Sequence, residues 1–86
     1  MSAETALDLT NQLVGHYTAK YTEAVKAEQA ALLEKENAVK SHAGGFIPIG
    51  VVELHDEIVA AADKQKDYFN VIVNNLNQIK AELKKS

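Results

Sequence analysis

Two histidines, His42 and His55, and two nearby carboxylates, Glu53 and Asp56, are the residues here whose types suit a metal ion. A metal site needs neutral imidazoles that converge with carboxylates. Histidines near helix ends more commonly cap the helix or lie half-buried between helices. We expect that second role, because no further polar residues are placed to orient the imidazoles. The sequence therefore predicts no metal site.

The remaining residue types give no catalytic pattern. No motif that marks a serine nucleophile with a histidine base and an acid is visible, and the Gly44-Gly45 pair lacks the other glycines of a phosphate-binding loop. The chain has 0 cysteines, which excludes disulfides and thiolate metal ligands. We therefore predict a protein that is not an enzyme and carries no cofactor.

Binding of nucleic acid is the next chemistry to consider, and Lys20, Lys26, Lys64 and Lys66 would have to supply it. The formal net charge is −3, the basic residues are scattered, and arginine is absent. Arginine is the usual side chain for bidentate contacts with phosphates and bases. A small dimeric helical bundle that regulates RNA or DNA is thus an alternative function, but nucleic acid is a disfavoured partner.

The elements that carry these residues are predicted by the position of glycine and proline. The segment 43–50 contains three of the 4 glycines and the only proline, and both types interrupt regular structure. The sequence predicts an all-α fold, with one helix over about 3–42, a turn over 43–50 and a second helix over about 51–84. Ser2 suits the N-cap of the first helix, and Pro48 suits the first turn of the second. The whole chain, 1–86, is then one helical-hairpin domain.

Apolar residues recur every seven positions in both predicted helices, as in a two-helix coiled coil. In the second helix the two series are Val51, Ile58, Gln65, Ile72 and Ile79, and His55, Ala62, Phe69, Leu76 and Leu83. In the first helix they are Val14, Tyr21, Glu28, Lys35 and His42, and Thr10, Tyr17, Ala24, Ala31 and Ala38.

Folding the chain at Phe46 and Ile47 brings these series into register. Ala24 then faces Phe69, and Glu28 faces Gln65. Glu28 and Lys35 interrupt the series, and we expect both to lie at its rim. In a second interpretation the seam shifts after Tyr21 to Val25, Leu32 and Val39, through a four-residue stutter.

Further apolar residues flank the series and widen the apolar face beyond what two helices need. We therefore predict that the hairpin dimerises, with itself or with another helical protein, into a four-helix bundle, and a homo-oligomer is expected. The predicted partner-binding residues on the helices are Leu13, Val25, Leu32, Val39, Val52, Val59, Tyr68 and Val73.

The predicted turn contains Phe46, Ile47 and Ile49, which are unusually apolar for a loop. They are candidates for partner binding or for contact with a membrane surface. The other interpretation is that Ile47 or Ile49 folds back onto the second helix as a hydrophobic staple.

The outline of the chain is similar to the WXG100 (ESAT-6-like) family of secreted helical hairpins. Length, lack of cysteine, the absence of a cleavable signal and a glycine-containing turn agree, whereas the Trp-x-Gly turn of that family is missing because there is no tryptophan. The tyrosine that precedes an acidic residue by four in its secretion signal is missing too, since Tyr68 is followed by Ile72. The resemblance implies export without a signal peptide.

The location of the chain is predicted only broadly. Residues 1–9 lack the basic start and apolar run of a secretory signal, and no apolar stretch approaches the roughly 18 residues of a membrane span. We expect a protein that is cytoplasmic or exported without a cleavable signal peptide. Its predicted function is a non-enzymatic protein–protein interaction or assembly module.

Overall fold

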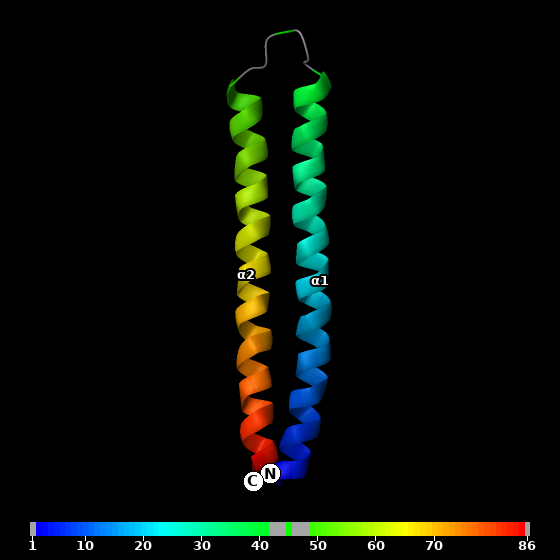
Figure 1. Ribbon diagram of the computed structural model, residues 1–86, viewed down its shortest axis with the longest axis vertical. Coiled ribbons are helices and arrows are strands. Elements are labelled where there is room, and N and C mark those ends of the chain that lie inside the picture. Colours follow the sequence, from blue (N-terminus) through cyan, green and yellow to red (C-terminus); the bar gives the residue numbers. More distant parts are fainter. Residues whose placement is uncertain (1, 42–44, 46–48, 86) are drawn as a thin grey trace.

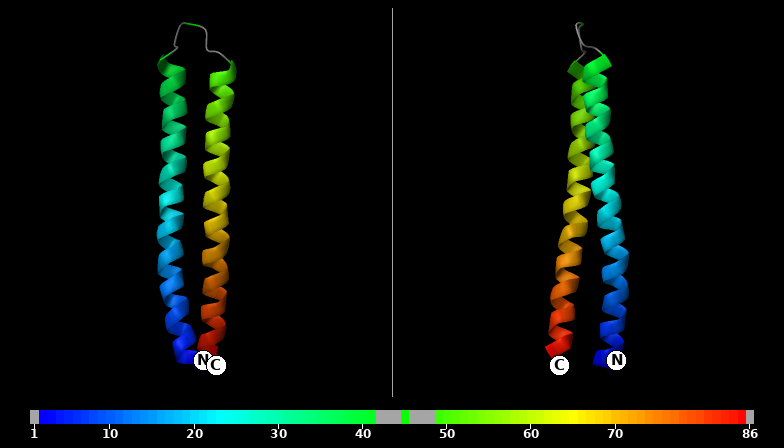
Figure 2. Two further views of the ribbon diagram at one scale, coloured as in Figure 1. Left: turned by 180° about the vertical axis from the view of Figure 1, so that it is seen from behind. Right: turned by 45° about the vertical axis from the view of Figure 1, so that its right-hand side comes forward.

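The computed structural model describes residues 2–41, 45 and 49–85, and its helices form an antiparallel hairpin (Figure 1). Helix α1 spans Ala3–Ser41 and helix α2 spans Ile49–Lys85. The helices lie side by side along their whole length in every view and cross slightly (Figure 2). The molecule measures 64 × 16 × 14 Å, which is a rod only two helices thick. The predicted all-α hairpin is confirmed.

The start of α1 follows local rules that the sequence makes visible. The Ser2 hydroxyl accepts a hydrogen bond from the Thr5 backbone N–H at 3.1 Å, so Ser2 is the predicted N-cap. Glu4 lies in the first turn, where a negative charge suits the helix dipole. Helix α2 begins two residues before the predicted position, at Ile49. Five residues with predicted roles lie outside the described part of the chain, namely His42, Gly44, Phe46, Ile47 and Pro48.

Helix α1 turns one continuous row of residues toward α2. The row follows alternating steps of three and four residues, and all its members are buried or half-buried. It comprises Thr10, Val14, Tyr17, Tyr21, Ala24, Glu28, Ala31, Lys35 and Ala38. The stutter is therefore wrong, because Leu32 and Val39 are exposed while Glu28 and Lys35 stay in the row. Glu28 is also more enclosed than a rim position, with only 17% of its side chain exposed.

Helix α2 is rotated relative to our prediction. The series through Phe69 faces α1 as expected, but the second series that accompanies it is one residue further along. The half-buried inner row is Val52, His55, Val59, Ala62, Lys66, Phe69, Val73, Leu76, Lys80 and Leu83. The predicted inward positions of Ile58, Gln65 and Ile79 are wrong, because all three are exposed. Their places are taken by Val59, Lys66 and Lys80.

The register of the two helices agrees with the prediction to within about one helical turn. Ala24 and Phe69 line the same pocket, as expected from folding the chain at its centre. Glu28 pairs with Lys66, the residue next to its predicted partner Gln65. The ring of Tyr17 packs against that of Phe69, with ring centroids 6.2 Å apart. The doubled-back arrangement therefore follows from the sequence, although the rotation of α2 does not.

The hairpin leaves much of its surface uncovered. Among the described residues only Thr10, Ala24 and Ala31 are buried, and Thr10 satisfies its hydroxyl by donating to the Ala6 carbonyl at 2.7 Å. The accessible surface is 6154 Å², against about 5,000 Å² for a compact monomer of this mass. The radius of gyration is 19.3 Å, against roughly 12 Å for a compact chain of this length. Two helices alone thus bury little apolar surface.

Candidate protein–protein interface

A second row of uncharged residues runs along α2, outside the contact with α1. Each member precedes a residue of the inner row by one position, so the second row is turned by about 100° around the helix axis. We call it the outer stripe, and it consists of Val51, Leu54, Ile58, Ala61, Gln65, Tyr68, Ile72, Asn75 and Ile79. Val51 and Ile72 are half-buried and the other seven are exposed.

Four large side chains of the outer stripe, those of Leu54, Ile58, Tyr68 and Ile79, are open to solvent. Exposure reaches 63% for Tyr68 and 57% for Leu54, and Ile58 and Ile79 are each 48% exposed. The row on the other flank of α2 is different in kind, because it contains Glu53, Asp56, Asp63 and Asp67. Cores of protein interfaces are depleted in charge, and solvated helix faces are not. The stripe therefore has the composition of a contact surface.

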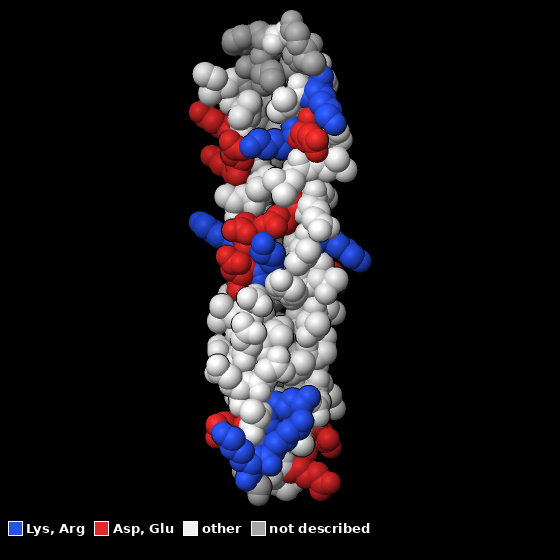
Figure 3. Space-filling view, viewed as in Figure 1, with Lys and Arg blue, Asp and Glu red and all other residues white. Residues whose placement is uncertain are grey.

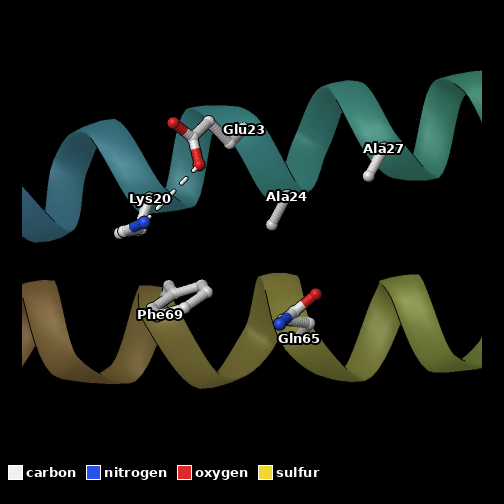
Figure 4. A pocket seen from close by; sticks show the side chains of 6 residues that line it. All are labelled: Lys20, Glu23, Ala24, Ala27, Gln65 and Phe69. Atoms are coloured by element: carbon white, nitrogen blue, oxygen red, sulfur yellow. Dashed lines mark ion pairs between the residues drawn. The ribbon is translucent and has the colours of Figure 1, made fainter.

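A shallow pocket of about 320 Å³ opens between the helices beside the outer stripe (Figure 4). Its lining comes from Lys20, Glu23, Ala24 and Ala27 of α1 and from Gln65 and Phe69 of α2. The Ala24 and Ala27 methyl groups point toward α2 and leave the space unfilled. Lys20 and Glu23 form an ion pair at 3.9 Å on its rim. Gln65 belongs to the stripe as well, so pocket and stripe share one side of the hairpin.

Ion pairs cross between the helices in the half of the rod near the connection. Lys66 Nζ lies 3.1 Å from Glu28 Oε1 and 3.1 Å from Asp63 Oδ1, and Lys35 pairs with Asp56. Figure 3 shows acidic and basic groups side by side in the middle of one face of the rod. The Glu28–Lys66 and Lys35–Asp56 pairs link α1 to α2 and oppose sliding of one helix along the other, whereas the Lys66–Asp63 pair lies within α2.

The pKa values of Asp63 and Lys66 are shifted within the Glu28–Lys66–Asp63 cluster. The pKa of Asp63 is lowered, first by hydrogen bonding with Glu28 and then by the hydrogen bond and charge of Lys66. The pKa of Lys66 is raised, because its ammonium group donates to Glu28 and to Asp63. Both shifts favour the ionised forms at neutral pH. The cluster links the two helices through the Glu28–Lys66 pair.

The structure divides the predicted partner-binding residues into two groups. Leu13, Leu32, Val39 and Tyr68 are exposed, whereas Val25, Val52, Val59 and Val73 are half-buried. Val52, Val59 and Val73 belong to the inner row of α2, so their expected place on the flank is wrong. Ile49 is exposed at the start of α2, and Phe46 and Ile47 lie outside the described residues. Tyr68 is the predicted residue that belongs to the outer stripe.

Sequence reasoning did not single out Leu54 or Ala61, which belong to the outer stripe. It assigned Ile58, Ile72 and Ile79 to the inner contact. The signal was present, because Leu54, Ala61, Tyr68 and Asn75 repeat every seven residues, as do Val51, Ile58, Gln65, Ile72 and Ile79. Two seven-residue patterns one residue apart share the same period, so periodicity alone does not separate them.

Of the two histidines considered for a metal ion, His42 lies outside the described residues. His55 lies half-buried in the inner row. No group of three or more histidine, aspartate or glutamate residues within the described part of the chain is placed to hold a metal ion. Of the four lysines considered for nucleic acid, Lys20 and Lys66 are engaged in ion pairs with carboxylates.

No protein-family model, curated protein or solved structure matches this chain. The likeness to the WXG100 family therefore stays one of outline. Neither α1 nor α2, over the residues described, has a stretch apolar enough to cross a membrane.

Proposed function

We propose that this chain is a non-enzymatic interaction and assembly module, which packs its helices against those of a partner protein. The partner is a second copy or another helical chain, and the complex is a four-helix bundle of coiled-coil type. The observation that carries the proposal is the outer stripe, nine uncharged positions in a row beside a contact that already uses the inner row. A helix in a four-helix bundle needs two such rows, one for each neighbour.

The surface area supports the same proposal. The chain exposes about 1,100 Å² more than a compact monomer of its mass, by the usual scaling of area with size. A standard interface covers about 800 Å² on each partner. The excess is therefore sufficient for one helical partner along one side. The proposal applies equally to a cytoplasmic chain and to one exported without a cleavable signal peptide.

Site-specific photo-crosslinking in the cells that make the protein tests this function. A benzophenone amino acid replaces Tyr68 in the outer stripe, and in a second variant it replaces Leu33, which is 55% exposed on α1 away from the inner row and from the pocket side. Irradiation is expected to give an adduct of one discrete mass from position 68 and none from position 33. No discrete adduct from position 68, or the same adducts from both positions, would contradict the proposal.

A further inference from the structure

We infer that the partner on the outer stripe is a second copy of this chain, with the two α2 helices antiparallel about a two-fold axis between Gln65 and Tyr68. The inference rests on the proposed function and adds the identity of the partner and the geometry of the contact. It is carried by the order of side chains in the stripe, by the pocket beside it and by the area that the hairpin leaves uncovered.

The stripe is complementary to itself when it is reversed. A two-fold axis between Gln65 and Tyr68 sets Leu54 against the partner's Ile79, and Ala61 against the partner's Ile72. Large side chains thus meet large ones at the ends, while a small one accommodates a branched one nearer the centre. A contact of this kind is isologous, which is the commonest arrangement of identical subunits.

A parallel pairing would fit less well. It would place each residue of the stripe beside its own copy, so that Tyr68 met Tyr68, Gln65 met Gln65 and Asn75 met Asn75. Two polar layers and one crowded aromatic layer would then lie in the contact. In the antiparallel pairing Tyr68 meets the partner's Gln65 and the crowding is removed, while Asn75 meets the partner's Ile58.

The pocket gives the exposed Tyr68 ring a place in this arrangement. Gln65 and Phe69 line it on α2, and Ala24 and Ala27 leave it unfilled on the α1 side. The axis brings the partner's Tyr68 to the level of Gln65, at the mouth of the pocket. A tyrosine fits such a place, because its ring packs on apolar groups while its hydroxyl reaches polar ones. Lys20 and Glu23 supply polar groups at the rim.

The extent of the stripe suits a dimer. From Val51 to Ile79 it runs about 42 Å along the helix at a rise of about 1.5 Å per residue. Covering it, together with the pocket beside it, uses much of the surplus surface of roughly 1,100 Å² estimated from the scaling of area with mass.

The lack of cysteine allows a direct test of the axis. In the full chain, Gln65→Cys places a unique thiol near the two-fold axis, and Asn75→Cys places another in the same stripe far from that axis. Under mild oxidation, Cys at position 65 is expected to form a covalent dimer quickly, while Cys at position 75 does not. Spin labels on the thiols should be close together at position 65 and about 26 Å apart along the helix direction at position 75, given a rise of about 1.5 Å per residue.

Affinity changes of opposite sign test the stripe itself. Leu54→Lys is expected to raise the dimer dissociation constant about tenfold or more, because a charge enters the apolar contact. Leu33→Lys is the matched control, because the exposed fraction of Leu33, 55%, is close to the 57% of Leu54. Since Leu33 lies outside the proposed contact, this substitution should change the dimer dissociation constant by no more than about twofold. Asn75→Leu should lower the constant, because Asn75 faces the partner's Ile58. Sedimentation equilibrium measures all three, and circular dichroism confirms that each variant is folded.

The outcomes separate this inference from the proposed function. Rapid crosslinking at position 65 alone, with the expected order of affinities, supports the inference. Crosslinking at both positions shows a parallel pair and overturns it, as does a dimer that Leu33→Lys weakens more than Leu54→Lys. A chain that stays monomeric at high micromolar concentration, or a photo-adduct at position 68 with a different protein, also overturns it. In the last case the proposed function stands.

Discussion

The two halves of the hairpin hold α1 against α2 by different means. In the half that contains the start of α1, large side chains such as Tyr17, Phe69 and Leu76 fill the inner rows. In the half near the connection, the inner rows contain small alanines and the ion pairs of Lys35 and Lys66. Burial of apolar area is strong and non-directional, whereas an ion pair adds little stability and constrains which residues meet.

We call the half that contains the start of α1 the aromatic half, and the half near the connection the ionic half. We infer that the aromatic half supplies most of the free energy of folding, and that the ion pairs of the ionic half select the register of the two helices. Two long helices with alanine-rich rows could otherwise slide past one another by a whole turn at little cost. Substitutions in either half, each compared with a matched substitution nearby, test this inference.

The largest effect is expected from Phe69→Ala in the aromatic half. The substitution removes the ring that contacts Tyr17 and lines the pocket with Ala24. The free energy of unfolding should fall by about 2 to 3 kcal/mol, below the roughly 3 to 5 kcal/mol of a fully buried ring, because Phe69 is only half-buried. Urea denaturation measures the change. Asn70→Ala, on the exposed face of the same turn, should not lower the free energy of unfolding. An equal loss in both variants would show that the inner position of Phe69 is not what makes it important.

A somewhat smaller effect is expected from Ala31→Leu in the half near the connection. Ala31 is buried at the contact between helices, so a larger side chain must push α1 and α2 apart. The expected loss of stability is about 1 to 3 kcal/mol. Ala30→Leu is the control, since Ala30 is exposed and leucine is almost as good a helix former as alanine. Thermal melts of the two variants should differ clearly, and coincident melts would show that the helices do not approach closely there.

Removal of the charge at Lys66 should have a smaller effect on stability than either change above. Lys66→Met leaves Glu28, whose side chain is 17% exposed, facing Asp63 without a compensating cation. Stability should fall, and Glu28→Gln should restore part of it in the double variant. Lys64→Met, at an exposed position two residues away, should have almost no effect. Additive losses for Lys66→Met and Glu28→Gln would show that the pair is not coupled.

The smallest effect is the dependence of stability on pH, which also comes from the ionic half. The pKa of Asp63 in the folded chain lies below its ordinary value of 3.8. Its contribution to the free energy of unfolding is therefore fully present above pH 3.8 and is lost as the pH falls through the pKa of the folded state. The pKa of Lys66 in the folded chain lies above its ordinary value of 10.5. Its contribution to the free energy of unfolding is therefore fully present below pH 10.5 and is lost as the pH rises through the pKa of the folded state. Urea midpoints should therefore decline at both extremes. Lys66→Met should remove the alkaline decline, and an unchanged alkaline decline in that variant would assign it to other groups.

Much of the hairpin could be predicted from short-range rules, and the candidate interface largely could not. Ser2 caps α1 as expected, and the glycine-rich centre separates two helices whose bounds agree within two residues. Ala24 and Phe69, which were predicted to face each other, line the same pocket. Of the residues predicted to bind a partner, only Tyr68 belongs to the outer stripe, because the rotation of α2 exchanged the expected inner and outer residues.

The sequence by itself determined the two helices, the position of the turn and the approximate register, that is, which residues of α1 lie beside which residues of α2. Glycine, proline and an N-cap act through neighbouring atoms, and the approximate register follows from the position of the turn. The tertiary structure alone decided which apolar row of α2 faces α1. The row through Ile58 is more apolar than the row through Val59, which contains Lys66 and Lys80, but the two rows have the same seven-residue period, so periodicity within α2 does not decide between them. The choice depends on the other helix, where Glu28 is satisfied by the ammonium of Lys66 and the small Ala24 leaves room for Phe69.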